Sequence, residues 1–106
     1  MTGTTEAAGP TLVTYIVECF WPGVRDALVA DGAERARTAA AALAVDGQPV
    51  TLTGSVLIPG DEVVFYLFEG PSLEAVHGVC QRAALPFERI LESFWNRAGA
   101  TREGNG

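Results

Sequence analysis

Hydrophobic and polar positions divide this chain into six segments whose order predicts an α+β domain. Four segments rich in β-branched and aromatic residues indicate strands, at residues 12–21, 50–58, 63–69 and 88–96. Residues 33–43 are rich in Ala, Arg and Leu, and residues 70–85 carry an apolar stripe at helical spacing, so both indicate helices. The helical composition begins earlier, at residue 24, but Asp31-Gly32 is expected to interrupt the helix, so the main helix is expected at residues 33–43.

The order strand-helix-strand-strand-helix-strand is that of the ferredoxin-like fold. Right-handed crossovers then give an antiparallel sheet with strand order 4-1-3-2 and both helices on one face. We expect one domain over residues 12–96, with disordered polar tails at 1–11 and 97–106. The other face of the sheet is left bare in a monomer.

The bare face is predicted to be apolar, because residues 63–68 are all apolar or aromatic, which indicates a strand buried on both faces. The alternation of side chains along each strand assigns one set to this face, although a slip of one residue would swap the sets. That set is Ile16, Glu18, Phe20, Leu52, Gly54, Val56, Val64, Tyr66, Phe68, Ile90, Glu92 and Phe94. The set expected to face the helices is Tyr15, Val17, Cys19, Phe65 and Leu67.

An apolar sheet face of this kind favours a homodimer in which two sheets meet face to face, a dimeric α/β barrel. Gly54 would leave room beneath the second copy, so a cavity for a small apolar molecule is expected between the sheets. The residues predicted to line it are Phe20, Leu52, Gly54, Val64, Phe68 and Phe94.

Two carboxylates interrupt this apolar set, Glu18 and Glu92, on strands expected to be neighbours. Close together they would form an acid/base pair, with Glu18 as general base, Tyr66 as donor to an oxyanion and Glu92 returning the proton. They would equally suit a divalent cation. A third interpretation leaves them near the rim, solvated or paired with Arg25 or Arg89.

Charge and composition exclude several classes of partner. The net charge is −6, from 13 acidic and 7 basic residues without a basic cluster, so neither a nucleic acid nor an anionic membrane is expected as a partner. The N-terminal residues lack the pattern of a signal peptide, which predicts a cytoplasmic protein with Cys19 and Cys80 reduced. His77 lies off the apolar stripe of its helix and is expected to face solvent.

Three stretches resemble a small actinobacterial nickel-binding family with a dimeric ferredoxin-like fold. They contain Glu18 in the first strand, the motif PS-x-EA at residues 71–75, and LP-x-x-RI at residues 85–90. The resemblance covers residues 14–94 and implies a homodimer and nickel as the cofactor, with Glu18 and Glu92 as the carboxylate ligands that remain.

Two departures from the family pattern bear on function. Gly54 stands where the family usually has His, and Tyr66 stands where it often has Cys, the softer ligands that nickel favours. A pocket without a cofactor therefore fits this chain better, for a metabolite-binding protein or a cofactor-independent isomerase or cyclase of secondary metabolism that acts on a polyketide-like substrate. Nickel binding and a dimerisation module without a ligand are the alternatives.

Overall fold

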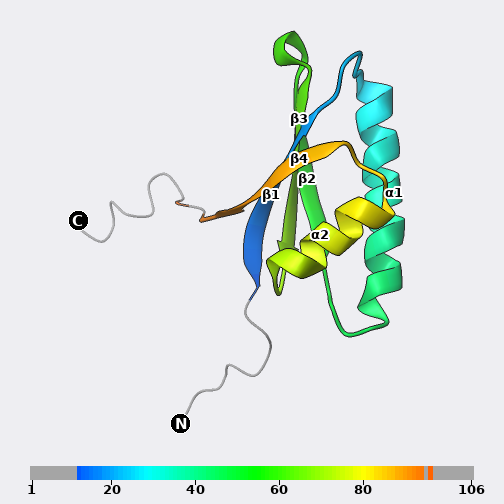
Figure 1. The fold of residues 1–106 in the computed structure, drawn as a ribbon, viewed down its shortest axis with the longest axis vertical. Coiled ribbons are helices and arrows are strands. Elements are labelled where there is room, and N and C mark those ends of the chain that lie inside the picture. Colours follow the sequence, from blue (N-terminus) through cyan, green and yellow to red (C-terminus); the bar gives the residue numbers. More distant parts are fainter. Residues whose placement is uncertain (1–11, 95, 97–106) are drawn as a thin grey trace, which may run out of the picture.

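The computed structural model describes residues 12–94 and 96, and the fold predicted from the sequence is confirmed over this range (Figure 1). A four-stranded antiparallel sheet has the strand order β2-β3-β1-β4, as expected for a ferredoxin-like domain. The elements in chain order are β1 (Val13–Phe20), α1 (Asp26–Ala44), β2 (Thr51–Ile58), a 3-10 turn (Pro59–Asp61), β3 (Val63–Gly70), α2 (Leu73–Arg82) and β4 (Phe87–Ser93). The two tails predicted to be disordered lie outside the described residues.

Both helices cover one face of the sheet, so the core lies in a single layer between helices and strands (Figure 1). Alternate residues of β1 are buried in this layer, namely Tyr15, Val17 and Cys19, as predicted. From α2, Val76 and Val79 are fully buried in the same core cluster. None of the helices in the described part of the chain has the length and apolar character needed to cross a membrane.

The first helix is longer than predicted, because Asp31-Gly32 does not interrupt it. Helix α1 begins at Asp26 and runs through Gly32 without a break. A Cβ at position 32 would overlap the hydroxyl oxygen of Tyr66, which comes from β3 below the helix. Gly32 is therefore a point of close approach between helix and sheet, and its lower helix propensity is tolerated for that reason.

The second helix begins as predicted, with Ser72 as its N-cap. The Ser72 Oγ accepts a hydrogen bond from the backbone N–H of Ala75 at 3.1 Å, and Glu74 lies in the first turn, where the helix dipole favours an acid.

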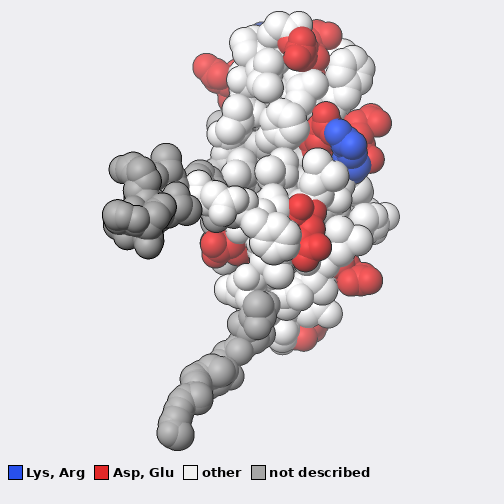
Figure 2. Space-filling view, turned by 90° about the vertical axis from the view of Figure 1, so that its left-hand side faces the viewer, with Lys and Arg blue, Asp and Glu red and all other residues white. Residues whose placement is uncertain are grey.

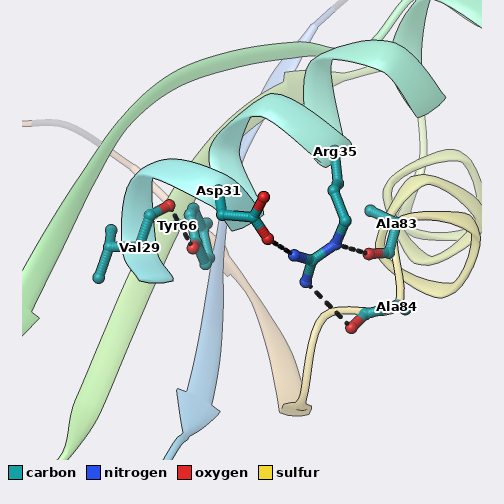
Figure 3. Close-up of polar contacts among 6 residues, drawn as sticks. All are labelled: Val29, Asp31, Arg35, Tyr66, Ala83 and Ala84. Carbon is teal, nitrogen blue, oxygen red and sulfur yellow. Dashed lines mark hydrogen bonds and ion pairs between the residues drawn. The ribbon is translucent and has the colours of Figure 1, made fainter. Parts of the chain in front are cut away.

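At the other end of α2, Arg35 of α1 ties the two helices together (Figure 3). Its Nε donates to the carbonyl oxygen of Ala83 at 2.7 Å, and its Nη2 donates to that of Ala84 at 3.4 Å. Asp31, one turn earlier on α1, forms an ion pair with the same guanidinium. These contacts satisfy carbonyl groups that the end of a helix otherwise leaves without partners.

Candidate ligand-binding face

The sheet face away from the helices carries the candidate site, and strand pairing fixes its residues. Glu18 lies opposite Phe65 of β3 and Arg89 of β4, while Ile16 lies opposite Leu67 and Leu91. Side chains at paired positions point to the same side of a sheet. We call this surface the open face; it comprises Ile16, Glu18, Phe20, Gly54, Val56, Ile58, Val63, Phe65, Leu67, Arg89 and Leu91, with Thr14, Thr51, Glu69 and Ser93 at one end.

The prediction for β3 was wrong by one residue. Val64, Tyr66 and Phe68 were expected on the open face, but all three are fully buried on the helix side. Their partners on β1 are Cys19, Val17 and Tyr15, the residues that face the helices. Phe65 and Leu67, expected under the helices, lie on the open face instead. The error arose because a strand that is apolar on both faces gives no alternation from which to read its register.

A bulge explains the error in β2. Leu52 lies opposite Phe68 and faces the helices, whereas Gly54 lies opposite Leu67 on the open face. Thr53 is the extra residue between them, so the parity of the strand reverses at this point. The predicted placement of Gly54 and Val56 on the open face is therefore confirmed, and the predicted placement of Leu52 there was wrong.

In β4 the predicted parity was also reversed. Ile90 lies opposite Val17 and packs against the core, and Glu92 lies opposite Tyr15. The expected pair of Glu18 and Glu92 does not form, because the two side chains point to opposite sides of the sheet. Phe94 follows the end of β4 without a strand partner, so its place in a ligand site remains a prediction.

Glu18 is on the open face as predicted, and its partner is Arg89. The Arg89 Nε donates to the Glu18 Oε1 at 2.5 Å, which confirms the interpretation in which the carboxylate is paired with this arginine. The Glu18 side chain is only 25 % exposed, whereas that of Arg89 is 64 % exposed. The guanidinium therefore extends outward from an apolar surface and remains open to further contacts.

Beside this ion pair is a hollow of about 340 Å³ that is lined only by apolar side chains. We call it the apolar hollow; its residues are Ile16, Val56, Ile58, Phe65, Leu67 and Leu91. Figure 2 views the side of the sheet away from the helices and shows mainly residues other than Lys, Arg, Asp and Glu, with one large group of basic atoms beside acidic ones. Val56 is 50 % exposed and Phe20 is 49 % exposed, a large exposure for apolar side chains that share one face.

Tyr66, predicted to be an oxyanion donor, is a buried structural residue. Its hydroxyl donates to the backbone carbonyl oxygen of Val29 in α1 at 2.9 Å (Figure 3). Burial raises the pKa of Tyr66 to about 12, helped by the nearby Cys19 and opposed by Arg35. The phenol is thus neutral, already paired, and on the wrong side of the sheet to reach the apolar hollow.

The two cysteines are also part of the core. Both are free thiols and fully buried. Burial raises the pKa of Cys19 to about 12, with Glu88 and Glu18 adding to the effect, and burial likewise raises the pKa of Cys80 to about 12. A nucleophile or a metal ligand must be a thiolate, so neither cysteine suits these roles.

Histidine and carboxylates offer no alternative centre within the described residues. His77 is exposed on α2, as predicted, and its ring meets that of Phe87 edge to face at 5.3 Å between centroids. Residues 12–94 and 96 contain no group of three or more His, Cys, Asp and Glu side chains arranged to hold a metal ion.

The comparisons with known proteins support the fold and leave the family open. No protein-family model matches the chain, and no curated protein matches it. Among solved structures it is similar to SCO4226 from Streptomyces coelicolor A3(2), known from a crystal structure analysis, with a TM-score of 0.60 and 23% sequence identity. The match covers 79% of this chain and 99% of SCO4226, and it shows a shared ferredoxin-like fold.

Proposed function

We propose that the protein binds a small apolar molecule on the open face, in a space that a second copy of the chain closes. The observation that carries the proposal is the apolar hollow beside the Glu18–Arg89 ion pair. Small-molecule sites are concave and mostly apolar, with a few polar groups that orient the ligand, and this combination is present on one face.

The second copy follows from the exposure of that face. Contiguous apolar surface of this extent is unusual on a soluble monomer. A two-fold contact between identical sheets would cover it with a surface of the same kind. The interior of the resulting barrel would hold two apolar hollows, with Gly54 adding space because it has no side chain.

Binding without catalysis is the function that these residues support. Of the three residues predicted to be catalytic, only Glu18 is on the open face, and its carboxylate is already bonded to Arg89. Proton transfer by an isomerase or cyclase would need a second acid or base close to Glu18, and the other acid of this face, Glu69, lies about 13 Å along β3 from Phe65, the partner of Glu18. Full turnover of an identified substrate, lost in Glu18→Gln, would extend the proposal from binding to catalysis.

Sedimentation velocity combined with the fluorescence of phenylnaphthylamine, a neutral apolar probe, tests the proposal. We expect a dimer that binds the probe, and a Val56→Glu variant that is monomeric and binds it at least tenfold more weakly, because the new carboxylate would be buried in the seam. Leu73→Glu is the matched control, because Leu73 is 46 % exposed but begins α2, away from the open face. This variant should leave the dimer and its affinity for the probe unchanged.

Two results would contradict the proposal. A monomer that fails to bind the probe would refute it. A protein that is purified with nickel, or that releases heat on titration with nickel and loses it in Glu18→Gln, would favour the metal-binding alternative, whose ligands would have to come from two copies or from outside the described residues.

A further inference from the structure

The Glu18–Arg89 ion pair indicates which polar group a ligand of the apolar hollow would have. Glu18 of β1 pairs with Arg89 of β4, and the neighbouring pair on the same face is Ile16 and Leu91. The two pairs are two residues apart along the strands, a distance of about 7 Å. Ile16 and Leu91 line the apolar hollow. A molecule whose apolar body fills the hollow would therefore place one polar end against the ion pair.

Both members of the pair have unused hydrogen-bonding groups. Glu18 engages only the Nε of Arg89, and neither Nη of that arginine has an acceptor among the described residues. The Oε2 of Glu18 likewise has no donor among them. The pair thus offers parallel donors from a planar guanidinium next to one carboxylate acceptor.

The charges of the open face select among ligands. Arg89 is its one basic residue, and Glu18 neutralises it. The other acid of the open face is Glu69, which lies four residues after Phe65, the partner of Glu18, on β3. The distance between Phe65 and Glu69 along the strand is about 13 Å. An anionic ligand would leave an unpaired negative charge in an apolar seam of a protein with net charge −6, and a cationic ligand would meet the Arg89 guanidinium.

We propose that the ligand is a neutral molecule with an apolar body and one polar end that both accepts and donates hydrogen bonds, such as a carboxamide or a hydroxy-ketone. Its carbonyl oxygen accepts from the Nη groups of Arg89, and its N–H or O–H donates to the Glu18 Oε2. A second copy brings an identical neutral pair, so the balance of charge also holds in the dimer. This inference rests on the function proposed above and specifies its ligand class.

Four naphthalene probes with the same ring system test it by calorimetric titration: the carboxamide, the carboxylate and the methylammonium ion, each substituted at the same carbon, and unsubstituted naphthalene. We expect the carboxamide to bind about tenfold more tightly than any of the other three, because only it satisfies both groups of the pair without adding charge. The double variant Glu18→Gln/Arg89→Gln should reduce this preference to about twofold or less while naphthalene itself still binds.

A matched control is the exposed ion pair of Glu34 and Arg37 on α1, at 3.3 Å. Glu34→Gln/Arg37→Gln makes the same chemical change away from the open face and should keep the full preference for the carboxamide. Tighter binding of the carboxylate or the methylammonium ion would overturn the inference. Equal binding of all four probes would also overturn it while leaving the proposed function intact, whereas failure of every probe to bind would refute the proposed function itself.

Discussion

The contact between Gly32 and Tyr66 makes a sharp prediction about stability. In the interior of a helix, Gly→Ala ordinarily stabilises by about 1 kcal/mol. Here the new Cβ would overlap the Tyr66 hydroxyl, which is fixed by its hydrogen bond to the Val29 carbonyl. Overpacking costs about 1–3 kcal/mol and loss of the hydrogen bond about 1 kcal/mol, so Gly32→Ala should destabilise by about 1–3 kcal/mol after its helix propensity is included.

Removal of the Tyr66 hydroxyl should reverse the sign of the stability change that Gly32→Ala causes. In a Tyr66→Phe background the nearest atoms to the new Cβ are Leu85 Cδ2 at 3.2 Å and the ring Cζ at 3.3 Å, contacts that a small shift relieves. Gly32→Ala should then be neutral or stabilising by up to about 1 kcal/mol, and Tyr66→Phe alone should cost about 1 kcal/mol. The double-mutant cycle therefore predicts a favourable coupling of about 1–4 kcal/mol between the two substitutions.

Urea unfolding of the four proteins, followed by far-ultraviolet circular dichroism at one fixed protein concentration, measures this coupling. A fixed concentration is needed because dimerisation would contribute to apparent stability. If Gly32→Ala had the same effect in both backgrounds, within about 0.5 kcal/mol, the close approach of helix and sheet would not exist as described.

Two further predictions concern the core and the helix cap. Stability should fall as pH rises from about 9 toward 12, because the unfolded thiols ionise near 9.0 while burial holds the pKa of Cys19 and Cys80 at about 12 in the folded state. Tyr66 adds to the fall above pH 10, because burial raises its pKa from 10.0 to about 12. The slope is about 1.4 kcal/mol per pH unit for each group that is ionised only in the unfolded state. All seven basic residues are arginines, so no lysine titrates in this pH range. Cys80→Ala should make the urea midpoint of unfolding fall less steeply with pH. A urea midpoint that is independent of pH up to 11 would contradict the burial of these groups. Ser72→Ala should lower stability by about 1 kcal/mol in thermal unfolding while Ser72→Asp retains it, and equal losses in the two variants would exclude the cap.

The fold was predictable from the sequence because its signals are local. Apolar strands, Ala-rich helix segments and the Ser72 cap each depend on neighbouring residues, and together they give the order of elements and the order of the sheet. Alternation in β1 was also correct, since Glu18 marks one face of a strand whose other face holds Tyr15, Val17 and Cys19.

The composition of the site was harder to predict, because it depends on register between strands. β3 is apolar on both faces, so nothing in its own sequence distinguishes Phe65 from Tyr66. The bulge at Thr53 and the pairing of Glu18 with Arg89 arise only when strands distant in the sequence meet. The sequence did contain one usable signal. If Glu18 is assumed to pair with Arg89, the register of β4 places Leu91, rather than Glu92, beside Ile16.

Gly32 gives a second example of a long-range cause. In the sequence, Asp31-Gly32 has the composition of a turn, and helix propensity alone favours an interruption. The glycine is instead required by Tyr66, thirty-four positions away, whose hydroxyl occupies the space of a side chain. Tertiary contact thus overrides the local preference.

Native mass spectrometry of protein purified from its own host shows directly whether the open face closes around a neutral apolar molecule. We expect a dimer that carries an additional neutral organic mass, which is lost together with the dimer in Val56→Glu. A monomer with no added mass, or a dimer whose only added mass is a metal ion, would contradict this expectation.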